Sequence, residues 1–178
     1  MTIKTMIRVW DPFIRAFHWG LVAAVAVAWL SADEWDDLHV ISGYVMAGAV
    51  AARLIWGFVG SHYARFAQFL PTPATILVHL RGTMTGRERR FLGHNPAAAT
   101  MIVALLGTLV GIAVTGWLLE NDAGDTVEDL HELLTNGLLF LIALHVAGVI
   151  LASVQHRENL TRAMITGDKR APEDGDIA

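Results

Sequence analysis

The sequence predicts an all-α membrane protein, built as a bundle of four transmembrane helices. Of its 178 residues, 54% are hydrophobic and only 17% are charged, whereas a soluble chain of this length needs a surface rich in charged side chains. Four long stretches carry few or no charges, and each is long enough to cross a bilayer as a helix. The chain has no cysteine, which excludes disulfides, thiolate zinc sites, iron–sulfur clusters and covalently attached haem.

The four spans can be placed from their charges and their start signals. Asp11 is predicted to cap the first helix, with Pro12 in its opening turn. The second span has one charge in its interior, Arg53, and the third begins at Asn95, which precedes a proline. The fourth follows an acidic stretch and ends before charge resumes at His156. The predicted spans cover residues 12–32, 37–59, 95–119 and 130–155.

The distribution of charge predicts the orientation of the chain in the membrane. All 13 Lys and Arg residues lie toward the side that holds the two termini and the middle loop. The two other loops hold ten carboxylates, counted through Glu132, and no Lys or Arg. Because cytoplasmic loops carry the excess of basic residues, both termini are predicted to be cytoplasmic. No small-residue cleavage site follows the first span, so the N-terminus is expected to remain attached.

Two segments lie outside the predicted spans. The middle loop, residues 60–94, is interpreted as an interfacial cytoplasmic connector, although its apolar residues from Phe66 to Leu80 also fit a short amphipathic segment. The chain is expected to form a single membrane domain over residues 1–167. Residues 168–178 make a polar, charged cytoplasmic tail, which its composition predicts to be disordered.

Four histidines fall within the predicted spans, where an imidazole is costly and usually marks a pathway, a relay or a cofactor. They are His18, His39, His131 and His145. His131 and His145 are nearly four helical turns apart, so both lie on one side of the fourth helix, separated by about 21 Å. Because helix direction alternates from span to span, His39 lies at the outer level of His131 and His18 lies at the inner level of His145. The sequence thus predicts two histidine pairs at two depths.

Each pair joins neutral imidazoles from two helices at one membrane level, as two axial ligands of a haem iron require. Two stacked b-type haems are therefore the predicted cofactors. Arg53 lies on the same face as His39, near the inner level. It would bind a haem propionate there, or instead extend its guanidinium to the cytoplasmic interface. Gly43, one turn after His39, leaves room for a flat macrocycle to approach the backbone.

Other interpretations of these histidines stay open at this point. They could be polar residues that bridge helices, as a single membrane histidine frequently is, although four matching positions favour haem. A proton relay would need a carboxylate in mid-membrane, and the spans have none outside their outermost turns. A metal-transport path would be expected to show Met or Cys ligands in series.

Several motifs give the chain a resemblance to a known family. They are Val9-Trp10-Asp11-Pro12, Phe17-His18-Trp19, His39 with Gly43, Arg53 to Gly60, Gly93-His94-Asn95-Pro96, Leu130-His131-Glu132 and His156-Arg157-Glu158-Asn159. From Val9 to Gly167 the chain resembles the bacterial cytochrome b561 family, which includes the b-type cytochrome subunits of nickel–iron hydrogenases. The resemblance implies a four-helix protein of the bacterial cytoplasmic membrane with two non-covalent haems b. Its axial ligands would be the residues at the four histidine positions named above.

The resemblance also implies electron transfer across the membrane, between the quinone pool and a partner such as an oxidoreductase subunit or a periplasmic cytochrome c. The acidic outer loops favour a cationic partner, such as a basic c-type cytochrome, and no nucleic acid is expected to bind. Some members of the family oxidise superoxide and reduce quinone. An acidic face would repel superoxide, so an electron-transfer role is preferred to a stand-alone enzyme. A non-redox membrane anchor, which needs only the helices, is a further alternative.

Overall fold

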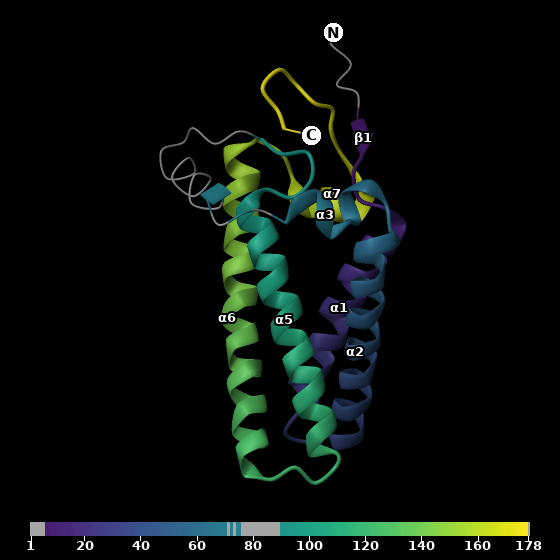
Figure 1. The fold of residues 1–178 in the computed structure, drawn as a ribbon, viewed down its shortest axis with the longest axis vertical. Helices are drawn as coiled ribbons and strands as arrows, with labels where there is room; N and C mark the ends of the chain where they lie inside the picture. The colour runs from purple at the N-terminus through teal and green to yellow at the C-terminus, as the bar shows by residue number, and fades with distance from the viewer. Residues whose placement is uncertain (1–5, 71, 73, 76–89, 178) are drawn as a thin grey trace.

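Four long helices lie side by side and form the body of the molecule (Figure 1). The computed structural model describes residues 6–70, 72, 74–75 and 90–177. The long helices are α1 (Pro12–Ser31), α2 (Asp36–Val59), α5 (Pro96–Leu119) and α6 (Asp125–Gln155). Each is long and apolar enough to cross a membrane. The predicted all-α, four-helix membrane fold is therefore confirmed.

The two ends of the bundle differ in charge, and we name them accordingly. The basic end holds the start of α1, the end of α6 and the described residues 60–70 that follow α2 (Figure 1). The acidic end holds the turns 32–35 and 120–124, whose charged side chains are all carboxylates. The basic and the acidic loops of the sequence thus lie at opposite ends of one bundle.

Side-chain caps fix the starts of α1 and α5 where the sequence predicts them. The carboxylate of Asp11 accepts a hydrogen bond from the main-chain N–H of Ile14 at 2.9 Å. The amide oxygen of Asn95 accepts from the main-chain N–H of Ala98 at 2.7 Å. Each cap satisfies an N–H group that has no partner within its own helix.

The fourth helix is longer than the sequence predicts. α6 begins at Asp125, ahead of the predicted span 130–155, and runs to Gln155. Asp125 and Glu128 occupy its first turn, where carboxylates stabilise the positive end of the helix dipole. The acidic residues that precede the apolar stretch therefore form the first turns of the same helix.

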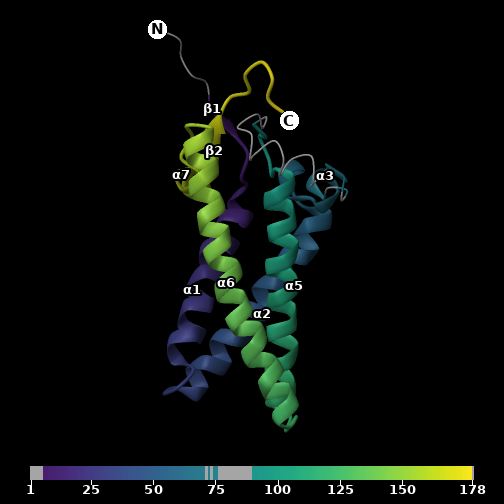
Figure 2. The same ribbon diagram turned by 90° about the vertical axis from the view of Figure 1, so that its left-hand side faces the viewer.

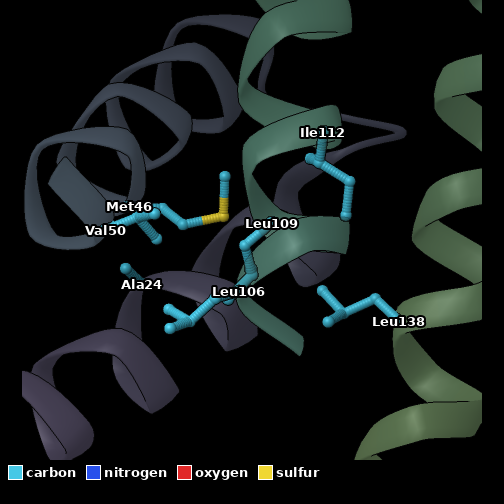
Figure 3. Packing of buried hydrophobic residues seen from close by; sticks show 7 residues of the cluster. All are labelled: Ala24, Met46, Val50, Leu106, Leu109, Ile112 and Leu138. Carbon is cyan, nitrogen blue, oxygen red and sulfur yellow. The ribbon is translucent and has the colours of Figure 1, made fainter. Parts of the chain in front are cut away.

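The long helices pack as two pairs. α1 packs on α2 and α5 packs on α6, and contacts between α2 and α5 join the two pairs (Figure 2). Buried apolar side chains from all four helices meet in one cluster: Ala24, Met46, Val50, Leu106, Leu109, Ile112 and Leu138 (Figure 3). Along α6, all of which the structure describes, only Leu138 is buried. The helix that carries two of the four membrane histidines is therefore the one that protein covers least.

Short elements close the basic end. They are the antiparallel strands β1 (Met6–Arg8) and β2 (Asp168–Arg170), the 3-10 helix η1 (His62–Ala64), and the helices α3 (Phe66–Phe69) and α7 (Leu160–Thr166). Gly167 ends α7 with a φ of 89°, a left-handed conformation that favours glycine. Its carbonyl accepts hydrogen bonds from the N–H groups of Val9 and Trp10. A Cβ at Gly167 would lie 2.6 Å from the carbonyl oxygen of Trp10. The close approach of Trp10 to the end of α7 therefore requires glycine.

The C-terminal tail is ordered through residue 177, and the prediction that it is disordered is wrong. β2 lies in this tail, and Lys169 within it is only 4% exposed. Arg90, which is also buried, pairs with Glu158 at 2.9 Å and with Asp176. Burial opposes the ionised form of Glu158, but the hydrogen bonds from Arg90 and from the main chain of Arg170, together with the charges of Lys169 and Arg90, lower the pKa of this carboxyl. The composition of the tail predicted disorder because it does not show that the charged residues of the tail have partners. Those partners, Arg90 and Glu158, lie outside the tail.

The described part of the middle loop contains η1 and α3. Phe69 in α3 is buried, so this part of the loop packs against the bundle. Leu80, in the predicted amphipathic segment, lies outside the described residues.

Candidate functional site

The structure brings the four membrane histidines together as two pairs. His39 of α2 and His131 of α6 have their ring centroids 6.3 Å apart, and His18 of α1 and His145 of α6 have theirs 6.5 Å apart. The helical rise separates the two histidines of α6 by about 21 Å along its axis. We call His39 and His131 the acidic-end pair, and His18 and His145 the basic-end pair. Three helices supply the four rings, and α5 supplies none.

The main chain of α1 fixes the tautomer of His39. Its Nδ1 lies 2.8 Å from the carbonyl oxygen of Ala28. Because a carbonyl oxygen can only accept, Nδ1 carries the hydrogen and Nε2 keeps its lone pair. His39 therefore presents an unprotonated nitrogen, the form that binds a metal, on the side of the ring away from Ala28.

A hydroxyl group on α5 fixes the tautomer of His131 in the same way. Nδ1 of His131 lies 2.8 Å from Oγ1 of Thr115, and this hydroxyl donates to the main-chain carbonyl of Gly111 at 2.9 Å. The hydroxyl has one hydrogen, so its oxygen accepts from Nδ1–H, and Nε2 of His131 keeps its lone pair. Thr115 is not among the sequence-predicted site residues. The sequence shows only that Thr115 is a polar residue in an apolar span. It could not identify His131 as the hydrogen-bond partner, because His131 lies on another helix.

Buried groups at the basic end have unused hydrogen-bonding capacity. Among the described residues, Nδ1 of His18 and Nη1 of Arg53 are buried without a hydrogen-bond partner. Arg53 is 4% exposed, donates from Nη2 to the carbonyl of Ala64 at 3.1 Å, and places its guanidinium over the Phe66 ring, 5.0 Å from the centroid. Arg53 is thus buried against the loop that follows α2, and its guanidinium is not exposed at the surface. A buried guanidinium with an unused donor is suited to bind an anion.

The helix faces near the histidines have open space beside them. Gly43 lies one turn after His39 on α2, and a Cβ built there would have nothing within 4 Å. The same is true of Gly137 and Gly148 on α6. A methyl group added at any of these glycines would therefore meet no described atom.

His94 lies just before α5, at the basic end. Its ring centroid is 4.6 Å from that of Trp10 and 4.6 Å from that of Phe69, and its Nδ1 is buried without a described partner. Burial and the positive charge of Arg53 lower the pKa of His94 to about 3, so the ring is neutral near neutral pH. A cavity of about 320 Å³ adjoins this ring. Its polar lining includes His62, Tyr63, Gln68 and Thr72.

The donor set of each pair fits haem iron. Among the described residues, no group of three or more His, Cys, Asp or Glu side chains could hold a metal ion, so each pair offers two imidazoles. Haem iron takes this number of protein ligands, because the porphyrin supplies the other four. Two imidazoles that bound one iron, with metal–nitrogen bonds of about 2 Å and about 1 Å from each nitrogen to its ring centre, would have centroids at most about 6 Å apart. Both pairs are close to this separation.

Comparison with known proteins gives one family match. A family model described as prokaryotic cytochrome b561 matches residues 9–167. No curated protein and no solved structure gives a significant match. The matched region contains both histidine pairs, and it ends at the glycine that terminates α7.

Proposed function

Because this chain belongs to the prokaryotic cytochrome b561 family, we propose that it is a di-haem b-type cytochrome that passes electrons across the bacterial cytoplasmic membrane, between the quinone pool and a redox partner. Its four apolar helices make it a multi-pass membrane protein. The observation that carries the proposal is the pairing of imidazoles from different helices at two levels, with centroids 6.3 and 6.5 Å apart. Haem iron, when bound, takes up and releases single electrons.

The histidine pairs would hold both haems without covalent attachment, since the chain has no cysteine. The acidic-end pair would bind one haem, and the basic-end pair would bind the other. At the acidic end, the hydrogen bonds to Ala28 and Thr115 leave Nε2 of both rings available for iron. The two levels would let one chain conduct electrons between the two membrane faces.

Arg53 and Gly43 have proposed roles around these haems. Nη1 of Arg53 is buried without a described partner, and a haem propionate would accept a charge-assisted hydrogen bond from it. Gly43 has open space beside it, where a porphyrin could lie against the backbone of α2. A larger residue at Gly43 would fill that space.

We propose that the acidic end faces the periplasm and the basic end faces the cytoplasm, because Lys and Arg are in excess on the cytoplasmic side of membrane proteins. The acidic-end loops carry ten carboxylates, counted through Glu132, and no Lys or Arg. Such a face attracts a positively charged protein and speeds its encounter. A basic periplasmic c-type cytochrome, or a basic face of an oxidoreductase subunit, is therefore the proposed partner.

We propose the cavity beside His94 as the place where quinone meets the chain. The neutral ring has a buried Nδ1 without a described partner, so the tautomer with its hydrogen on Nδ1 can donate a hydrogen bond to a quinone oxygen. Phe69 and Tyr63 give the cavity aromatic walls, which suit a quinone ring.

Two other functions use the same fold. A superoxide oxidase that reduces quinone would bind the same haems, but the carboxylates of the acidic end would repel superoxide. A non-redox membrane anchor would need the helices without the paired histidines. The donor set of the pairs therefore favours an electron-transfer protein.

A reduced-minus-oxidised difference spectrum of the purified chain tests the proposal. We expect the absorption bands of low-spin haem b, and a weaker spectrum in the His131→Ala variant. Protein made in haem-replete cells and purified without any haem bands would refute the proposed function.

A further inference from the structure

We infer that Thr115 is the positioning residue for His131, and that its hydroxyl lowers the reduction potential of the acidic-end haem. The inference rests on the proposed function, because it concerns a group that the acidic-end pair would hold. Thr115 comes from α5, the one long helix that supplies no histidine. The structure thus assigns this helix a part in the site through another residue.

The hydrogen bonds of Thr115 have one consistent direction. Its Oγ1 lies 2.9 Å from the carbonyl oxygen of Gly111 and 3.2 Å from that of Ile112, in the preceding turn of the helix. Two oxygens this close require a hydrogen between them, so the hydroxyl donates to the main chain. The lone pairs of Oγ1 are then directed to Nδ1–H of His131 at 2.8 Å. Thr115 is 4% exposed, so water does not compete for this bond.

The neighbour of Thr115 brings α5 close to the same ring. A Cβ at Gly116 would lie 3.3 Å from Cε1 of His131, a tight contact that glycine avoids. The ring is therefore held from one side by the hydroxyl of Thr115 and approached by the bare backbone of Gly116. Together these contacts restrict the orientation of the His131 ring, whose centroid lies 6.3 Å from that of His39.

The other histidine of the acidic-end pair, His39, bonds to a main-chain carbonyl, and a side-chain substitution does not remove that carbonyl. Nδ1 of His39 donates to the carbonyl of Ala28, whereas Nδ1 of His18 at the basic end has no partner among the described residues. A hydrogen bond from Nδ1–H makes the imidazole a more basic ligand, which favours the ferric state of a bound haem. Among the described residues, Thr115 is thus the side chain whose substitution removes a hydrogen bond from an acidic-end histidine and leaves the basic-end pair unchanged.

Redox titration of the full-length haem-loaded protein, with electron paramagnetic resonance of the ferric haems, tests this inference. Thr115→Val keeps the shape and removes the hydroxyl, and Thr115→Ser restores the hydroxyl. Thr100→Val is the matched control, because the Thr100 hydroxyl makes the same bond one turn back, to Pro96 at 2.9 Å, on the same helix and is not placed next to a histidine ring. The His131→Ala variant identifies which redox and resonance component belongs to the acidic-end haem.

We expect Thr115→Val to raise the midpoint potential of the acidic-end component alone. The expected change in the ferric-to-ferrous ratio is about tenfold, or about 59 mV for one electron. Thr115→Ser and Thr100→Val should behave like the wild type. Loss of the acidic-end haem in Thr115→Val, with its retention in Thr115→Ser, would also support a positioning role.

Two results would overturn the inference. One is a Thr115→Val protein with two haems and unchanged potentials, and the other is a shift in the component that survives in His131→Ala. Either result would leave the proposed function intact, whereas a wild-type protein without haem would refute the function itself. The failure of the inference and the failure of the function are therefore distinguishable.

Discussion

The rings of His18 on α1 and His145 on α6 lie with their centroids 6.5 Å apart. These two helices belong to different packed pairs, which are joined through α2 and α5. α6 buries only Leu138 against protein, so a group held between the histidines would add contacts that α6 otherwise lacks. We therefore expect haem binding to stabilise the fold as well as to supply its redox chemistry.

Replacing Arg53 with Met removes the buried guanidinium while keeping a long side chain. We expect the midpoint potential of the basic-end haem to fall, because a nearby positive charge favours the reduced, less positive state. Haem should also bind about tenfold more weakly, through the loss of the propionate contact. Spectroelectrochemical titration measures the potential. Arg65→Met is the control, because Arg65 is exposed and donates to the carbonyl of Gly60, and equal shifts in both variants would contradict the role of Arg53.

The protein should lose stability as the pH falls below the ordinary pKa of His94. Burial lowers this pKa from 6.5 to about 3 in the folded chain. Between these values the unfolded chain binds a proton that the folded chain does not. The free energy of unfolding should therefore fall by up to about 1.4 kcal/mol per pH unit toward acid.

The variant His94→Phe tests this pH dependence, since a phenyl ring can occupy the space between Trp10 and Phe69. Thermal unfolding of the detergent-solubilised protein across the same pH range should show a flatter slope than in the wild type. Equal slopes in the two proteins would show that His94 does not titrate as its burial requires. If quinone binds beside His94, the same variant should raise the KM for quinone without changing haem content.

Glu158→Gln should destabilise the basic end. The carboxylate of Glu158 pairs with Arg90 at 2.9 Å and lies 3.7 Å from the ammonium of Lys169, and both cations are buried. Removing its charge breaks the pairing with Lys169 and leaves Arg90 paired with Asp176, and breaking a buried ion pair costs about 3–5 kcal/mol. The free energy of unfolding and proteolysis of the tail would report the loss.

Glu173→Gln provides the comparison for Glu158. Glu173 pairs with Arg170 at 3.5 Å, but its side chain is 56% exposed, so we expect a change below about 1 kcal/mol. An equal loss of stability in Glu158→Gln and Glu173→Gln would contradict the role of the buried ion pairs of Glu158.

The stabilisation from Glu158 should depend on pH. The fold lowers the pKa of Glu158, so its stabilisation is present above the ordinary pKa of 4.5. The stabilisation is lost as the pH falls through the lowered value.

Electron exchange with a basic c-type cytochrome should slow as salt is added. The acidic-end carboxylates attract a cationic partner over several ångströms, and salt screens this attraction, with a Debye length of about 10 Å at 0.1 M. Stopped-flow measurement of the bimolecular rate constant at increasing ionic strength would show the decline. Superoxide that reduces the haems near the diffusion limit, with little salt dependence, would instead favour the superoxide oxidase.

Features that depend on one helix could be predicted from the sequence. The caps at Asp11 and Asn95 are local, and the spacing of His131 and His145 follows from helical periodicity alone. Depth matching across helices then gave the two pairs, because membrane spans alternate in direction. These features need no knowledge of how the helices pack.

Features that depend on contacts between distant segments could not be predicted. The bond from His131 to Thr115 joins α6 to α5, and the bond from Arg53 to Ala64 joins α2 to the loop after it. The ordered tail depends on Arg90, which is remote from it in the sequence. Charge and hydropathy describe each segment by itself, so they do not identify these partners.

The number of haems per chain tests the central claim most directly. A pyridine haemochrome assay, combined with quantitative amino-acid analysis of the purified chain, measures it. We predict two haems b in the wild type, and one in His131→Ala and one in His145→Ala, each lacking a different spectral component. His156→Ala, which changes a histidine at the end of α6 outside both pairs, should keep two. One haem per wild-type chain, or haem content unchanged by either pair variant, would contradict the two histidine-bound haems.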